Sequence, residues 1–136
     1  EYKNLVIDDV DFLDAGPMSG LLSAFKGNLN CSILALGCDY PMLAEDHIKM
    51  LLSFKDFHFP AVSFVRKSLP NMFEPLMTLY HSSCRDLLIK YYEDGNRSLN
   101  KFLSSINTLK IEVVEDAFLK SFDSPEDFDG FKSHIS

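Results

Sequence analysis

The sequence predicts an α/β fold in which helices pack against a mostly parallel sheet. Two observations support this fold class. Short apolar runs with the length of buried strands alternate with segments whose apolar residues recur every three or four positions, as on one face of a helix. No internal repeat, low-complexity tract or linker interrupts this alternation. We therefore expect residues 1–136 to form a single domain built as an α/β sandwich.

The expected strands and helices follow one another in a regular order. Apolar runs and alternation predict strands at residues 5–7, 33–36, 61–65, 76–80 and 109–113. Helical periodicity predicts helices at residues 17–25, 44–54, 83–94 and from 98 onwards. Residues 66–71 are expected to form a turn. A last helix is expected to begin at Ser124, which can cap it, with Pro125 in the first position.

The helix expected at residues 17–25 has clear end signals and one unusual residue. Pro17 suits the first helical position, Gly16 suits the tight turn before it, and Gly27 can close the helix in the left-handed conformation. Gly20 lies inside the helix, where Gly costs about 1 kcal/mol relative to Ala. The small residues on its side of the helix are Ser19, Gly20, Ser23 and Ala24. This side either admits another backbone or a ligand, or Gly20 is merely tolerated.

The apolar run at residues 33–36 is typical of a buried central strand. It stops at Gly37, Asp39 follows, and Pro41 prevents the strand from continuing. Asp39 is therefore expected just past the carboxyl end of a strand, at the edge where open α/β sheets bind ligands. A carboxylate there either holds Mg²⁺, which prefers oxygen ligands, or only caps a turn or the next helix.

Two other apolar segments also end in acids. Residues 5–7 precede Asp8 and Asp9, and residues 118–122 precede Asp123. If these segments are neighbouring parallel strands, their acids share one rim, where two charges about 4 Å apart repel by roughly 4 kcal/mol at an effective dielectric of about 20. A divalent cation would turn that repulsion into binding. Helix 17–25 is expected to begin on the same rim, and helix starts attract phosphate, so these features predict nucleotide chemistry.

Composition and charge argue against several other function classes. The net charge of -7 and the pI of about 4.9 disfavour non-specific binding to nucleic acid or to an anionic membrane. No apolar run in the sequence is long enough to span a bilayer. The three cysteines show neither zinc-ligand nor disulfide-framework spacing, so we expect a cytoplasmic setting. P-loop, dinucleotide-binding and nucleophile-elbow motifs are absent from the sequence.

Six short segments carry a resemblance to a known family. VIDD at 6–9, GPMSGL at 16–21 and LALGCDYP at 34–41 come first. EPLMTLY at 74–80, GNRSL at 95–99 and FDSPED at 122–127 follow in the same order. Together they resemble the molybdenum cofactor guanylyltransferase family over nearly the whole chain. The combination of GPxxG with CDxP at this separation makes the resemblance fairly specific.

The resemblance implies a three-layer, Rossmann-like nucleotidyltransferase fold. It also implies Mg²⁺-dependent transfer of GMP from GTP to molybdopterin, with release of pyrophosphate and with Asp39 as the catalytic metal ligand. The positions that match family residues near the nucleotide are Asp9, Gly16, Pro17 and Gly20, and Asp123 stands where the family usually has an Asn near the substrate phosphate. No nucleic-acid or membrane partner is expected, whereas contact with other molybdenum cofactor proteins is.

One family feature precedes the matched segments. The family begins with a strand and a Gly-rich loop that grips the triphosphate and helps to select guanine, and this sequence starts after that unit. We therefore expect the sheet to lack the family's first strand–loop–helix unit, and this chain alone to be inactive. Two alternatives stay open: a related cytidylyl- or sugar-phosphate nucleotidyltransferase, and a non-catalytic nucleotide-binding descendant of the fold.

Overall fold

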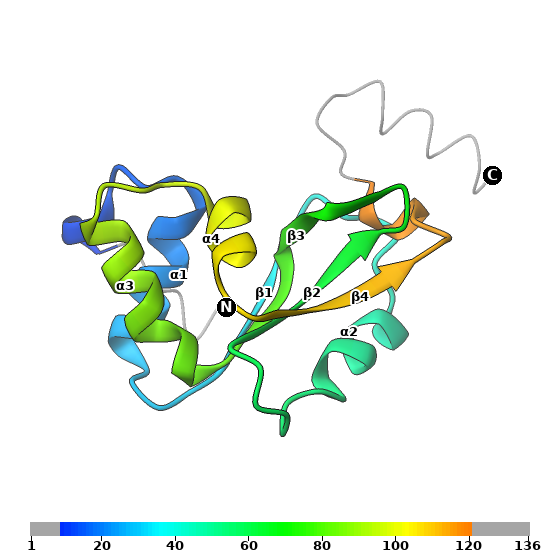
Figure 1. Ribbon diagram of the computed structural model, residues 1–136, viewed down its shortest axis with the longest axis horizontal. Helices are drawn as coiled ribbons and strands as arrows, with labels where there is room; N and C mark the ends of the chain where they lie inside the picture. The colour runs from blue at the N-terminus through cyan, green and yellow to red at the C-terminus, as the bar shows by residue number, and fades with distance from the viewer. Residues whose placement is uncertain (1–8, 121–136) are drawn as a thin grey trace, which may run out of the picture.

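The structure is a computed structural model that describes residues 9–120. Its four-stranded sheet has the order β1-β3-β2-β4 (Figure 1). The strands are β1 (Ile33–Leu36), β2 (Ala61–Arg66), β3 (Leu69–Tyr80) and β4 (Thr108–Val113). β2 pairs in parallel with β4, whereas β3 pairs antiparallel with both β1 and β2. β1, β2 and β4 therefore point in one direction, which confirms a mostly parallel α/β sheet with β3 running against the other three.

Helices cover both faces of the sheet. The α-helices are α1 (Pro17–Gly27), α2 (Glu45–Leu52), α3 (Arg85–Glu93) and α4 (Leu99–Ser105). The short 3-10 helices are η1 (Val10–Phe12), η2 (Ser82–Cys84) and η3 (Ala117–Leu119). Helices α1, α3 and α4 share one core cluster on one face, and α2 and η3 share another cluster on the opposite face. The predicted three-layer arrangement is confirmed.

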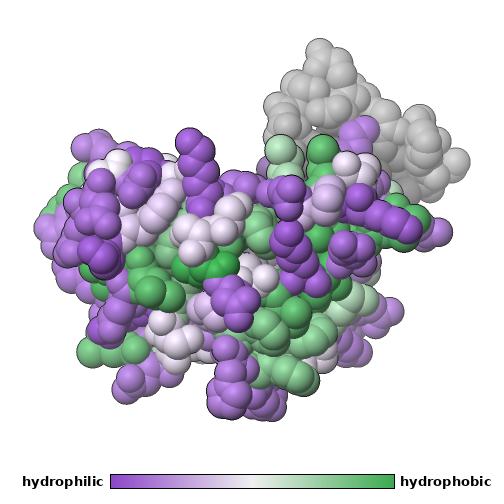
Figure 2. All heavy atoms as spheres, viewed as in Figure 1, coloured by the Kyte–Doolittle hydropathy of each residue, from purple (hydrophilic) through white to green (hydrophobic). Residues whose placement is uncertain are grey.

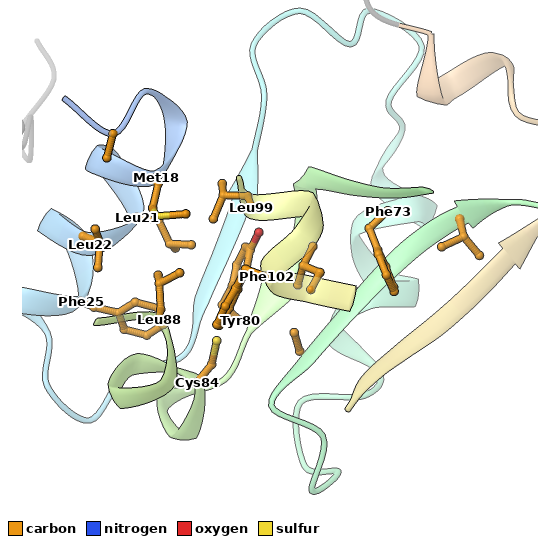
Figure 3. Packing of buried hydrophobic residues seen from close by; sticks show 14 residues of the cluster. Met18, Leu21, Leu22, Phe25, Phe73, Tyr80, Cys84, Leu88, Leu99 and Phe102 are labelled. Atoms are coloured by element: carbon orange, nitrogen blue, oxygen red, sulfur yellow. The ribbon is translucent and has the colours of Figure 1, made fainter. Parts of the chain in front are cut away.

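The larger core lies between the sheet and helices α1, α3 and α4. Figure 3 shows side chains from these helices directed toward Tyr80, which is fully buried at the end of β3. Phe25 of α1, Leu88 of α3 and Phe102 of α4 are each almost completely buried around it. Burying a side chain of this size stabilises a fold by about 1.5–3 kcal/mol, so this cluster fixes α1 against the sheet.

The second core lies between the sheet and α2. Val62 and Phe64 of β2 alternate with Ala61 and Val65, so that the two pairs point to opposite faces of the sheet. All four are fully buried, which explains why this strand reads as a continuous apolar run. Figure 2 shows that apolar side chains still reach the surface at the lower right, where Figure 1 places α2.

The strand expected at residues 33–36 has the predicted bounds but a different place in the sheet. β1 lies at the edge of the sheet that the described residues form, and its side chains are only partly buried. Ile33 and Ala35 contact the core on the α1 side, and Leu34 contacts the core on the α2 side. A run of apolar residues indicates that both faces of a strand are covered. It does not indicate whether both edges of the strand are paired with other strands.

Three further expectations are corrected. Phe118 and Leu119 form a 3-10 helix rather than part of a strand, because both side chains turn into the α2 core. Gly27 ends α1 without a positive φ, and Asn28 caps the helix in a different conformation. The turn expected at 66–71 is much shorter, because β2 runs to Arg66 and β3 already begins at Leu69. The strand and helix expected at 5–7 and from Ser124 lie outside the described residues.

Candidate functional site

The carboxyl ends of β1, β2 and β4 share one rim of the sheet, as parallel strand directions require. α1 begins at this rim, because Pro17 lines one cavity together with Leu36 at the end of β1 and a second with Tyr40 just beyond it. Each cavity has a volume of about 300 Å³. They form an apolar groove between α1, β1 and the start of α4. A helix start, a strand end and a groove therefore meet at one place.

Asp39 lies on a tight loop directly after β1. The loop begins where the Gly37 N–H donates a hydrogen bond to the Leu76 carbonyl, 2.8 Å away. A Cβ added to Gly37 would lie 2.7 Å from Asp39 Oδ1 and 2.6 Å from Cε2 of the Tyr40 ring. Both side chains thus close over the Gly37 backbone, and no larger residue fits beneath them. The predicted place of Asp39, just past the carboxyl end of a strand, is confirmed.

Tyr40 connects the Asp39 loop to a polar cluster on neighbouring strands. Its hydroxyl donates a long hydrogen bond to Glu74 Oε2 at 3.3 Å. Glu74 Oε1 lies 3.4 Å from Arg66 Nη2, and the Glu74 side chain is only 14% exposed. Arg66 in turn donates to the Leu119 carbonyl at 2.9 Å and lies 3.7 Å from Asp116 Oδ2. The cluster therefore ties the ends of β1, β2 and β4 together.

The charges in this cluster influence one another. Burial raises the pKa of Tyr40 to about 12, and the negative charges of Glu74 and Asp39 add to that effect. Burial also raises the pKa of Glu74, although the nearby Arg66 opposes the shift. The Tyr40 phenol is consequently neutral at physiological pH and remains a hydrogen-bond donor.

The first turn of α1 has the geometry that its sequence predicts. Gly16 has a φ of 56°, a left-handed value that favours Gly, and Pro17 occupies the first turn of the helix. Gly20 and Ala24 line the groove against β1. The neighbouring Ser19 and Ser23 face the other way, where Ser23 Oγ accepts a hydrogen bond from the Asp9 N–H at 2.7 Å. The side of α1 that carries Ser23 thus lies against the backbone at Asp9, and the side that carries Gly20 and Ala24 borders the groove.

The prediction that Asp9 and Asp39 share one rim is wrong, because Asp9 belongs to a different cluster at the other end of α1. Its carboxylate caps η1 by accepting from the Asp11 N–H and lies 2.8 Å from Lys26 Nζ. The hydrogen bond from Lys26 lowers the pKa of the Asp9 carboxyl group. Lys26 lies in the last turn of α1, away from the end at which Pro17 meets the rim. No contact within the described part of the chain joins Asp9 to Asp39, and Asp123 lies outside that part.

Sequence reasoning missed three side chains of the rim cluster, namely Tyr40, Arg66 and Glu74. Arg66 was expected in a turn and Glu74 only as the residue before a strand. The bulge that presents Glu74 depends on pairing between β2 and β3, which no local pattern encodes. The one local signal is Glu74-Pro75 itself, since a Pro inside a strand indicates a bulge or an edge.

Among residues 9–120 no group of three or more His, Cys, Asp or Glu side chains could hold a metal ion. Fewer than three such side chains therefore surround Asp39 in this range, and the Asp39 carboxylate is one donor there. This donor fits Mg²⁺, which proteins commonly bind through one or two carboxylates while phosphate oxygens and water complete the shell.

Comparison with known proteins places this geometry in context. No protein-family model matches the chain. A molybdenum cofactor guanylyltransferase from Campylobacter jejuni subsp. doylei is 28% identical over 135 residues, which are 98% of this chain and 69% of the relative. The protein of the same name from Pseudomonas entomophila is 26% identical over 127 residues, which are 92% of this chain and 65% of the relative. The chain is similar to molybdenum cofactor guanylyltransferases.

Solved structures support the same fold. Molybdopterin-guanine dinucleotide biosynthesis protein A from Archaeoglobus fulgidus aligns with a TM-score of 0.71 at 17% identity, over 87% of this chain and 62% of that one. A protein from Aquifex aeolicus VF5 aligns with a TM-score of 0.68 at 16% identity, over 84% of this chain and 60% of that one. The predicted resemblance is thus confirmed, and the chain spans about two thirds of the length of these proteins.

Proposed function

We propose that the protein containing this chain transfers GMP from GTP to molybdopterin and releases pyrophosphate. The observation that carries the proposal is the place of Asp39, a carboxylate just past the carboxyl end of β1 on the rim where α1 begins. The curated relatives named molybdenum cofactor guanylyltransferase support the reaction class. The two cavities of about 300 Å³ each, one lined by Leu36 and the other by Tyr40, support a small-molecule substrate rather than a macromolecule.

In the proposed reaction a phosphate oxygen of molybdopterin attacks the α-phosphorus of GTP. The bond from that phosphorus to the bridging oxygen of the β-phosphate breaks, and pyrophosphate leaves. The first turn of α1 would attract phosphate at the rim through the positive end of the helix dipole, since Pro17 has no N–H and the Met18 and Ser19 N–H groups already donate to the Ala15 and Gly16 carbonyls. Gly16 shapes the turn that leads to Pro17, and Gly20 keeps the groove open for the nucleotide. The chain's contribution is positioning and charge stabilisation, without a covalent intermediate.

Asp39 would hold Mg²⁺ together with the phosphate oxygens of the nucleotide. When bound, the ion supplies neutralisation of the charge that develops on the phosphoryl oxygens. A single carboxylate suits an ion that arrives with the triphosphate. Asp9 and Asp123 remain predicted substrate contacts, and neither has a described contact with Asp39.

The setting of the reaction belongs to the same proposal. All three cysteines are free thiols, which fits the reducing cytoplasm. None of the helices between residues 9 and 120 is long and apolar enough to cross a membrane. Contact with other proteins of molybdenum cofactor synthesis is a further part of the proposal, and so is the action of residues 1–136 as one structural unit.

The test is an assay of nucleotide specificity with the full-length protein that contains this chain. The protein is incubated with molybdopterin and Mg²⁺ and with GTP, CTP or ATP in turn, and pyrophosphate release and the dinucleotide product are measured. The proposal predicts a guanine dinucleotide from GTP and little product from CTP or ATP. Preference for CTP would assign the protein to the cytidylyltransferases, and binding of GTP without turnover would make it a non-catalytic descendant.

A further inference from the structure

We propose that Glu74 and Tyr40 are positioning residues that hold the Asp39 loop in one conformation. A bulge in β3 presents the Glu74 carboxylate to the Tyr40 hydroxyl, and this contact fixes the tyrosine ring over Gly37 beside Asp39. The inference rests on the proposed function, because it assigns both side chains to the metal-binding loop of that function.

A bulge in β3 interrupts its pairing with β2. Ser63 of β2 pairs with Thr78 of β3, but Val65 pairs with Phe73, so a two-residue step on β2 is matched by a five-residue step on β3. Residues 74–77 therefore leave the ladder with β2. Bulges of this kind bend a strand and redirect its side chains, and they occur beside active sites.

Buried hydroxyl groups stabilise the bulge. Thr78 Oγ1 donates to the Glu74 carbonyl at 2.7 Å, and Ser63 Oγ lies 3.3 Å from the same oxygen. The Tyr80 hydroxyl donates to the Pro75 carbonyl at 2.9 Å. Ser63, Thr78 and Tyr80 are all fully buried. Since a buried carbonyl without a partner is costly, these three side chains stabilise the bulge by providing partners for the Glu74 and Pro75 carbonyls.

The bulge carries one charged side chain, the carboxylate of Glu74. The Glu74 side chain is only 14% exposed, and burial of its carboxylate costs free energy unless it is paired. Arg66 compensates that charge at 3.4 Å and is itself anchored by the Leu119 carbonyl. The fold thus keeps a compensated carboxylate at this point, facing the Tyr40 hydroxyl.

The position of the Tyr40 ring affects Asp39. The Tyr40 ring and the Asp39 carboxylate both close over Gly37, so a movement of the ring changes the space that holds the carboxylate. The position of a reacting or metal-binding group matters steeply, since a misplacement of about 1 Å can cost about a hundredfold in rate. Neutral Tyr40 acts here as a donor that orients the loop.

The experiment compares Tyr40→Phe with the unaltered full-length protein. Hydrogen exchange of the peptide covering residues 37–43 is measured without metal or nucleotide, and the Mg²⁺ concentration for half-maximal turnover is measured with GTP and molybdopterin. We expect faster exchange in that peptide and a Mg²⁺ requirement raised about threefold to tenfold, the effect of losing one hydrogen bond. Glu74→Leu should reproduce both changes, whereas Glu74→Gln, which keeps an acceptor oxygen, should largely restore the exchange pattern.

Tyr92→Phe is the matched control, because the Tyr92 hydroxyl donates to the Asp11 carbonyl at 3.0 Å in a different cluster. It should leave both readouts unchanged. Unaltered exchange and an unaltered Mg²⁺ requirement in Tyr40→Phe would overturn the positioning role, even if Asp39→Asn abolishes turnover. Should Asp39→Asn retain full turnover, the proposed metal role fails, and hydrogen exchange alone still decides whether Tyr40 and Glu74 order the loop.

Discussion

At the scale of single residues, Asp39 carries the main prediction. Asp39→Asn keeps the shape of the side chain but removes the charge that would bind Mg²⁺. Because metal neutralisation is worth several kcal/mol in the transition state, turnover should fall by about a hundredfold or more. Asp46→Asn is the control, since Asp46 is an exposed acid in the first turn of α2. Turnover of both variants is measured in the steady state at saturating GTP. Equal turnover in the two variants would remove Asp39 from the mechanism.

Two glycines provide a second residue-scale prediction. A Cβ at Gly37 would meet Tyr40 and Asp39 at less than 3 Å, whereas a Cβ at Gly27 would meet no atom within 4 Å. Gly37→Ala should therefore displace the Asp39 loop and lower turnover at least about tenfold. Gly27→Ala should raise the free energy of unfolding by about 0.5–1 kcal/mol and leave turnover unchanged. Thermal unfolding and turnover are measured for both variants, and a fully active Gly37→Ala protein would disprove the tight closure.

At the scale of elements, the β3 bulge is the feature to test. Thr78→Val removes the buried hydroxyl that binds the Glu74 carbonyl and should cost about 1–2 kcal/mol of unfolding free energy. It should also lower turnover, because the bulge presents Glu74 to the Asp39 loop. Thr108→Val removes a similar hydrogen bond, from Thr108 Oγ1 to the Leu103 carbonyl at 2.7 Å. Thr108→Val should lower stability without lowering turnover. Equal turnover in the two variants would show that the bulge does not affect the site.

The same scale shows what the sequence could predict. The bounds of β1 follow from four apolar residues ended by Gly37. α4 begins directly after Ser98, where the helical periodicity predicts its start, and Ser98 Oγ accepts from the Lys101 N–H. Local chemistry sets those features. The edge position of β1, the bulge and the Arg66–Glu74 pair depend on partners distant in sequence. Asp39 was predictable because it follows a strand directly, whereas Glu74 required the register of β2 and β3.

At the scale of the whole molecule, we predict that the buried His81 makes the stability of the fold depend on pH. His81 is 9% exposed between β3 and η2, and its Nε2 has no hydrogen-bond partner among the described residues. Burial lowers the pKa of His81 from its ordinary value of 6.5, although nearby Phe54 and Asp56 oppose the shift. As pH falls below 6.5 the unfolded state therefore binds a proton that the folded state resists, and stability is lost.

Thermal unfolding at about pH 7.5 and about pH 5.5 tests this dependence, which is limited to about 1.4 kcal/mol per pH unit for one group. The midpoint of the unaltered protein should fall more between these pH values than that of His81→Gln. The comparison uses the change in the unfolding midpoint between the two pH values, since His81→Gln itself shifts the midpoint at both of them. Parallel profiles would show that His81 does not titrate differently in the folded and unfolded states.

The most direct test of the whole account is a crystal structure of the full-length protein with Mg²⁺ and a non-hydrolysable GTP analogue. We predict that Mg²⁺ bridges the phosphates at the rim where β1 ends and α1 begins, with an Asp39 oxygen about 2.0–2.1 Å from the ion. An ion bound to the phosphates with Asp39 touching neither the ion nor its water ligands would contradict the account.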